Sequence, residues 1–206
     1  MRFLPELFQN NRAWAKRHLA RDPEFFARLC AIQSPAHLWI GCSDSRVPAN
    51  EIVGLAPGEL FVHRNVGNVV RPDDRNCLAV LQFAIEHLRV AHIMVTGHYG
   101  CGGVQAAFAP PAPGPLGEWV DPIRAVRMAH ADELDRLPDD LARGHRLCEL
   151  NVMDQVATLS RLPVITEAWR RAQPVTLHGW IYDLQDGLIR DLGVSLDGPA
   201  PGGSPG

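Results

Sequence analysis

The amino-acid sequence predicts an α/β protein whose mostly parallel sheet has the strand order 2-1-3-4, with a fifth, antiparallel edge strand, helices on the faces and an N-terminal helical arm. Two observations carry this prediction. Short apolar runs alternate along the chain with segments of helical periodicity, which is the pattern of α/β folds. Two of the predicted strands, at 38–41 and 93–96, begin with the apolar runs Leu-Trp-Ile (38–40) and Ile-Met-Val (93–95), as strands buried in parallel sheets do.

The N-terminal half supplies the arm and three strands. Residues 2–20 carry a helical stripe of apolar side chains, and Asp22-Pro23 offers an N-cap and a first-turn proline for a short helix at 24–31. Strands are predicted at 38–41, 59–64 and 93–96, with a strongly apolar helix at 76–89 before the third. The parallel strands are expected to be joined by right-handed crossovers.

The C-terminal half completes the sheet. Proline and glycine at 110–117 predict a loop, and helical patterns follow at 119–137, 139–159 and 163–171. A strand at 175–182 is joined through the Asp186-Gly187 turn to a strand at 188–194, which predicts an antiparallel hairpin. The whole chain, 1–206, is expected to form a single domain, with 1–31 as the arm and 198–206 as a disordered tail.

Composition excludes several functional classes. The formal net charge of −3 argues against a nucleic-acid surface, and no apolar run approaches the ~20 residues of a membrane span. The N-terminus lacks the apolar core of a signal peptide. Five cysteines are too few and too scattered for a disulfide framework, so we expect a reducing cytoplasm. Three of them, Cys30, Cys77 and Cys148, are predicted to be buried structural thiols.

Two segments at strand ends carry the candidate chemistry. Cys42 and Asp44 follow the strand at 38–41, and His98 and Cys101 follow the strand at 93–96. These four side chains form a ligand set suited to zinc. Zinc bonds of ~2.3 Å to sulfur and ~2.0 Å to nitrogen require Cys42 and His98 to lie close together. The first and third strands are therefore expected to be neighbours, which creates a topological switch point where α/β sheets bind ligands.

The type of zinc site follows from Asp44 and Arg46. Structural zinc sites mostly hold four cysteine or histidine ligands, whereas an aspartate with a nearby arginine is a displaceable fourth ligand. A catalytic zinc is therefore favoured over a structural one. A thiol redox protein would have a Cys-x-x-Cys motif, which this chain lacks.

The segments around these residues closely resemble the β-class carbonic anhydrases. The resemblance extends over residues 33–194 and is most specific at Trp-Ile-Gly-Cys-Ser-Asp-Ser-Arg-Val-Pro (39–48), Val-His-Arg-Asn-Val (62–66), Gly-His-Tyr-Gly-Cys-Gly-Gly (97–103) and Leu-His-Gly-Trp-Ile-Tyr-Asp (177–183). It implies a zinc enzyme that interconverts carbon dioxide and bicarbonate. It also implies a homodimer as the minimal unit, held by the N-terminal helices, with a tetramer as the larger assembly.

The resemblance also assigns roles to individual positions. Cys42, His98 and Cys101 match the permanent zinc ligands, and Asp44 and Arg46 match the catalytic pair. Asp44 is expected to switch between zinc, in a closed state, and Arg46, in an open state. Two further sets match binding residues. Substrate is expected at Gln33 and Gly102, and an inhibitory second bicarbonate site, as in some bacterial members, at Trp39, Arg64 and Tyr182.

Two other functions use the same fold and ligands. A hydrolase of carbonyl sulfide or carbon disulfide would differ in pocket shape, which the sequence does not show. A non-catalytic zinc-binding module would leave the Asp44–Arg46 pair without a role.

Overall fold

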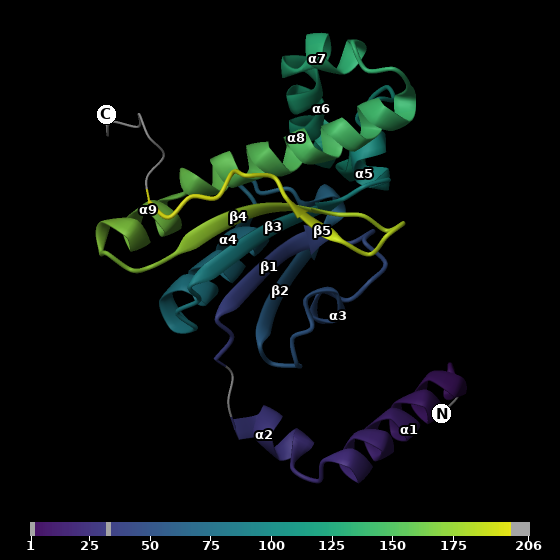
Figure 1. Ribbon diagram of the computed structural model, residues 1–206, viewed down its shortest axis with the longest axis vertical. Helices are drawn as coiled ribbons and strands as arrows, with labels where there is room; N and C mark the ends of the chain where they lie inside the picture. The colour runs from purple at the N-terminus through teal and green to yellow at the C-terminus, as the bar shows by residue number, and fades with distance from the viewer. Residues whose placement is uncertain (1–2, 32–33, 199–206) are drawn as a thin grey trace. The chain divides into compact units, whose positions relative to one another are not determined.

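The computed structural model describes residues 3–31 and 34–198, and the chain divides into two compact units, Met1–Ser34 and Pro35–Gly206 (Figure 1). The last eight residues of the predicted tail lie outside the described part. The division of the chain into a single domain with an N-terminal arm remains a prediction.

The N-terminal unit is a pair of helices, α1 (Pro5–Arg21) and α2 (Phe25–Ala31). Asp22 lies in the turn before the second helix, which begins at Phe25 rather than at 24 as predicted; its Oδ1 accepts the Glu24 N–H at 3.2 Å and its carboxylate pairs with Arg28. Trp14 packs edge-on against Phe26, with ring centroids 5.6 Å apart. Neither helix buries a residue, so the prediction that Cys30 is a buried thiol is wrong: two short helices enclose too little volume, and this thiol is exposed.

The second unit contains the five-stranded sheet. Its strands are β1 (His37–Cys42), β2 (Leu60–Asn65), β3 (His92–His98), β4 (Thr176–Tyr182) and β5 (Ile189–Asp191). They lie in the order β2-β1-β3-β4-β5, with the first four parallel and β5 antiparallel to β4. The predicted fold class and strand order are confirmed, including the adjacency of β1 and β3 that the zinc geometry required.

The remaining helices connect these strands. In chain order they are α3 (Ala49–Val53), η1 (Val66–Asn68), α4 (Arg75–Gln82), η2 (Phe83–His87), α5 (Gly102–Gln105), α6 (Pro115–Ala129), α7 (Ala131–Asp135), α8 (Asp140–Ser160) and α9 (Pro163–Arg170). The Asp139 side chain caps α8 by accepting the Ala142 N–H at 2.8 Å.

Several predicted boundaries are wrong for local reasons. The helix predicted at 76–89 is α4 followed by the π-turn η2, which ends before Arg89 at a left-handed φ of 58°. The helix predicted at 119–137 is interrupted at His130, and it begins earlier, because Pro115 within the predicted loop takes the first helical turn. The last strand, β5, extends only from Ile189 to Asp191 and is therefore shorter than the predicted 188–194.

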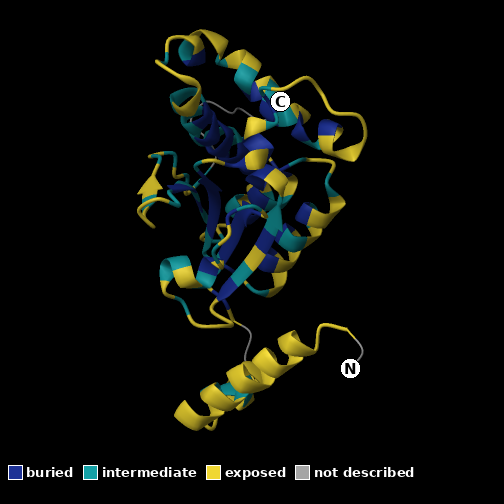
Figure 2. Cartoon of the chain, turned by 90° about the vertical axis from the view of Figure 1, so that its right-hand side faces the viewer, coloured by how far each residue is buried: buried dark blue, intermediate teal, exposed yellow. Residues whose placement is uncertain are grey.

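The two faces of the sheet differ in cover. One face packs against α4, α8 and α9 in a large core that includes Leu38 and Ile40 of β1, and α6 joins this core through α8 (Figure 1). Figure 2 shows the buried residues of the sheet in dark blue. Close approach of α8 requires glycine at position 97, since a Cβ there would lie 2.7 Å from Val152 Cγ2. On the other face a small cluster around Trp39 and Met94 lies beneath α3.

Candidate metal centre

Three of the predicted ligands meet at the carboxyl ends of two neighbouring strands. Cys42 is the last residue of β1, His98 is the last of β3, and Cys101 stands immediately before α5. One ligand atom from each lies within 4.8 Å of the other two, and the two sulfurs are 3.5 Å apart. All three side chains are at most 1% exposed, so they form a buried Cys-His-Cys group.

His98 presents one ring nitrogen to this group. Its Nδ1 lies 3.0 Å from the Tyr99 carbonyl oxygen, and because a carbonyl only accepts, Nδ1 carries the proton. Nε2 is therefore the lone-pair nitrogen, and it is buried with no hydrogen-bond partner in the described part of the chain. A buried acceptor without a partner is costly, and a metal ion bound here would be the missing partner.

The two sulfurs differ in their surroundings. Cys42 Sγ accepts backbone N–H groups from Gly67 at 3.2 Å and from Asp44 at 3.3 Å. A hydrogen bond from Cys101, together with these N–H groups, holds the pKa of Cys42 well below its usual range. The same contact with Cys42, and burial, raise the pKa of Cys101. The pair therefore favours a thiolate at Cys42, which is the form that binds metal.

Asp44 lies beside this group and is paired with Arg46 and with the Gly102 N–H. Arg46 Nη2 is 3.2 Å from Asp44 Oδ1, and the Gly102 N–H donates to Oδ2 at 3.0 Å. Arg46 has a left-handed φ of 59°, and the Val47 N–H bonds back to the Ser45 carbonyl at 2.6 Å. This strained turn directs the arginine toward Asp44. Asp44, predicted as a displaceable fourth ligand, is thus held by Arg46 and Gly102 rather than within the Cys-His-Cys group.

Arg64 holds the loop that carries Asp44. Its guanidinium donates to the Cys42 carbonyl from Nη2 at 2.6 Å and from Nε at 2.9 Å, to the Val47 carbonyl at 3.4 Å, and to the Ser45 hydroxyl. One side chain therefore spans the segment from the end of β1 to Val47. From the sequence we predicted that Arg64 binds an anion, but we did not predict that it anchors this loop.

The other residues of the predicted second bicarbonate site share a face of the sheet with Arg64. Register pairs Arg64 with Gly41, two residues after Trp39, and pairs Tyr182 with His98. Trp39 is 3% exposed and packs against Trp180, and Tyr182 is 7% exposed. Within the described residues, no hydrogen bond or ring contact joins the three to one another. Gln33, the predicted substrate residue, lies outside the described residues.

A second grouping was not anticipated from the sequence. His63, Asp74 and Cys77 bring ligand-type atoms within 4.8 Å of one another. Asp74 caps α4 by accepting the Asn76 N–H at 3.0 Å, and burial together with Asp74 raises the pKa of Cys77 to about 12. The thiol is therefore neutral, and the Asp74 carboxylate is already engaged at the start of α4, so this grouping is the weaker candidate for a metal.

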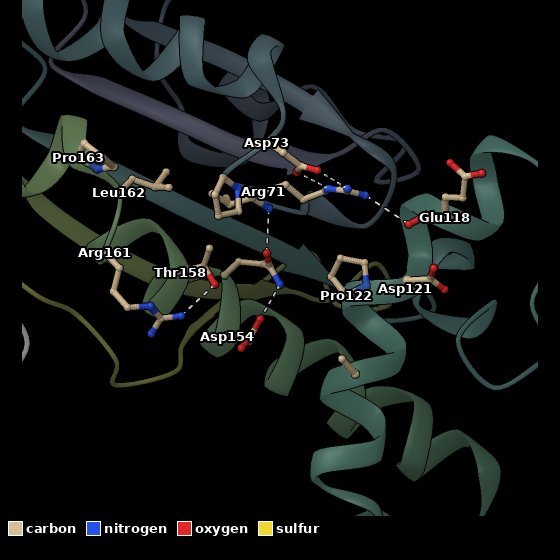
Figure 3. A pocket seen from close by; sticks show the side chains of 14 residues that line it. Arg71, Asp73, Glu118, Asp121, Pro122, Asp154, Thr158, Arg161, Leu162 and Pro163 are labelled. Carbon is tan, nitrogen blue, oxygen red and sulfur yellow. Dashed lines mark hydrogen bonds and ion pairs between the residues drawn. The ribbon is translucent and has the colours of Figure 1, made fainter.

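A separate cleft of about 660 Å³ lies between the segment 70–73, α6 and α8 (Figure 3). Arg71 on its wall pairs with Asp73 and donates to the Glu118 carbonyl at 3.3 Å. None of the Cys-His-Cys ligands lines this cleft, which is therefore distinct from the candidate metal centre.

Comparisons with known proteins agree with this geometry. A family model described as carbonic anhydrase matches residues 37–189. A carbonic anhydrase of Emericella nidulans is 47% identical over 193 residues, covering 94% of this chain and 85% of that protein.

Solved structures give the same result. A β-carbonic anhydrase of Coccomyxa in complex with acetazolamide has a TM-score of 0.90 and 37% identity, covering 96% of this chain and 90% of that one. One of two tetrameric β-carbonic anhydrases of Sordaria macrospora has a TM-score of 0.87 and 40% identity, covering 93% of this chain and 97% of that one. Across residues 3–31 and 34–198, no helix has the length and apolar character needed to cross a membrane.

Proposed function

Since this chain belongs to the β-carbonic anhydrase family and is thus an enzyme, we propose that it catalyses the reversible hydration of carbon dioxide to bicarbonate and a proton at the Cys42–His98–Cys101 centre. The observation that carries the proposal is the buried Cys-His-Cys group with the Asp44–Arg46 pair beside it. A purely structural zinc site does not need that pair.

The residues present fit a zinc ion. Two sulfurs 3.5 Å apart and a lone-pair imidazole nitrogen without a partner make the three-ligand set of a catalytic site, in which a fourth position stays open. When bound, zinc makes water acidic enough to attack carbon dioxide near neutral pH.

The chain's own side chains orient the reactants. Both Asp44 oxygens are fixed, one by Arg46 and one by the Gly102 N–H, and each keeps a lone pair that can accept a hydrogen bond from an entering water. Arg46 thus acts by holding the carboxylate beside the Cys-His-Cys group. The proposed closed state arises when Asp44 leaves this pair and becomes the fourth ligand.

The proposed second bicarbonate site would control that exchange through Arg64. Its guanidinium donates to the Cys42 and Val47 carbonyls, which bracket Asp44 and Arg46. Bicarbonate between Arg64, Trp39 and Tyr182 would compete for the same donors and release the loop. Bicarbonate can shift the equilibrium between the open and closed states only to the extent that it binds the closed state more tightly than the open one.

We also propose a homodimer as the minimal assembly. Leu7 and Phe8 of α1 are 55% and 43% exposed, and neighbouring exposed apolar side chains are typical of surfaces that bind another protein chain. The Sordaria relatives are described as tetrameric, and a tetramer of this chain would be built from such dimers.

Stopped-flow carbon dioxide hydration, combined with zinc quantification, tests the function. The Arg46→Ala variant should stay folded and zinc-loaded but lose activity by about 100-fold, because Asp44 is no longer held. The matched control is Arg170→Ala, which breaks an exposed ion pair with Glu167 and should keep full activity. Zinc-loaded protein that hydrolyses carbonyl sulfide without hydrating carbon dioxide would contradict the proposal.

A further inference from the structure

One peptide group joins Trp119 to the metal centre. The Val66–Gly67 peptide donates its N–H to Cys42 Sγ at 3.2 Å, and its carbonyl accepts the Trp119 indole N–H at 2.7 Å. Trp119 lies on α6, more than fifty residues further along the chain. A side chain remote from Cys42 in sequence is therefore two hydrogen bonds away from its sulfur.

The surrounding loop is held in one conformation. Gly67 has a left-handed φ of 76°, and a Cβ on it would lie 2.8 Å from Ile123 Cδ1. On the far side of its Cα, the Gly67 carbonyl accepts Asn151 Nδ2 at 2.9 Å, and Asn151 is fully buried. The N–H that faces Cys42 thus has little freedom to turn away while the indole and Asn151 remain in place.

The indole itself is fixed from its other side. Arg71 lies over the Trp119 ring, 5.6 Å from its centroid, and is held by Asp73 and the Glu118 carbonyl (Figure 3). Trp119→Phe would keep an aromatic ring for Arg71 while removing the indole N–H. Trp169→Phe, the matched control, loses the same ring volume.

We propose that Trp119 is a positioning residue that, through the Val66–Gly67 peptide, orients and polarises the N–H donated to the Cys42 sulfur. The inference rests on the proposed metal centre. A peptide whose carbonyl accepts a hydrogen bond donates more strongly through its N–H, an effect of roughly 10–30% per bond. An N–H held on a thiolate draws charge from the sulfur and fixes its direction, which tunes the metal that the sulfur binds.

The test compares two tryptophans that make the same hydrogen bond. Trp119→Phe removes the indole donor, and the matched control Trp169→Phe removes an indole that donates to the Val175 carbonyl, also at 2.7 Å, away from the centre. Each full-length protein is freed of metal and reloaded with Co²⁺ or Zn²⁺. We measure the sulfur-to-cobalt charge-transfer band and the zinc affinity in competition with a chelator.

Trp119→Phe should move the charge-transfer band to longer wavelength and weaken zinc binding by about 10-fold, whereas Trp169→Phe should match the wild type. An unchanged band and affinity in Trp119→Phe overturns the inference while leaving the metal centre intact. Wild-type protein without a charge-transfer band would overturn the metal centre as well.

A second measurement uses the wild-type chain and therefore does not depend on whether the variant folds. Addition of zinc to the metal-free protein should shift the Trp119 indole ¹⁵N–¹H signal, because its partner peptide donates to a metal ligand, and should leave the Trp169 signal in place. A Trp119 signal that moves no more than the Trp169 signal also overturns the inference.

Discussion

At the scale of single residues, the balance between burial and hydrogen bonding separates the Cys42 thiol from those of Cys77 and Cys148. Cys42 receives two backbone N–H groups that favour its thiolate. Cys77 and Cys148 are buried as well, but burial raises the pKa of each to about 12, so both stay protonated. Burial thus keeps the Cys77 and Cys148 thiols protonated, whereas the contact with Cys101 and two backbone N–H groups favour the thiolate at Cys42.

Membership of the Cys-His-Cys group, rather than the pKa of the thiol, predicts the outcome of two alanine variants. Cys101→Ala should lose zinc almost completely, because a catalytic site needs three protein ligands. Cys77→Ala should retain one zinc per chain, since Cys77 lies outside the Cys42–His98–Cys101 group. Elemental analysis after dialysis decides both. Full zinc in Cys101→Ala would refute the ligand assignment, and zinc loss in Cys77→Ala would make the His63–Asp74–Cys77 group a second metal site.

The sequence allowed the ligands to be predicted but not the residues that support them. Cys42, His98 and Cys101 stand at the ends of apolar strands, where residue type and position point to a metal. The supporting contacts of Arg64 and Trp119 end on backbone carbonyls. Their geometry depends on the Gly67 and Arg46 conformations, both at positive φ, which no residue pattern specifies.

At the scale of elements, the strand order followed from chemistry, whereas helix boundaries did not follow from periodicity. One metal shared by the ends of β1 and β3 requires those strands to be adjacent, and they are. Periodicity could not locate the π-turn at Phe83–His87 or the break at His130, because an apolar face continues across both. Tertiary packing determines where such a segment leaves the helix.

Three histidines form a row across the sheet, and the row predicts acid sensitivity. The rings of His37 and His92 stack at 5.6 Å, and His92 Nδ1 lies 3.2 Å from His178 Nε2. Burial first, and then His92 and His37, lower the pKa of His178, while Asp191 opposes them. As pH falls below ~6.5, the unfolded chain binds the proton before the folded chain does, so stability is lost.

The free energy of unfolding, measured with urea at saturating zinc, should therefore fall between pH 7.5 and 5.5. His178→Gln should reduce this fall, and His87→Gln, at an exposed position, should leave it as in wild type. Burial also lowers the pKa of His63. The His178→Gln variant should therefore still lose some stability as the pH falls. An identical pH dependence in wild type and His178→Gln would show that the row does not titrate with folding.

At the scale of the whole molecule, the N-terminal unit leaves large apolar side chains exposed. Its large apolar side chains include Leu7, Phe8, Trp14 and Leu19, each at least 40% exposed. Two helices that bury no residue of their own gain little from folding alone. A second copy of the chain is the partner that the family resemblance implies, and a homodimer repeats each contact by symmetry.

Charge placed on α1 should separate the copies. The double variant Leu7→Asp/Phe8→Asp should have the mass of a monomer in light scattering, because a dimer would bury four carboxylates without partners. Gln9→Asp/Asn10→Asp adds the same charge to exposed polar positions of the same helix and should retain the wild-type mass. Both should keep zinc, since Cys42, His98 and Cys101 come from a single chain. If the Leu7/Phe8 variant keeps the wild-type mass, α1 does not hold the assembly; if its control also dissociates, charge rather than apolar contact governs it.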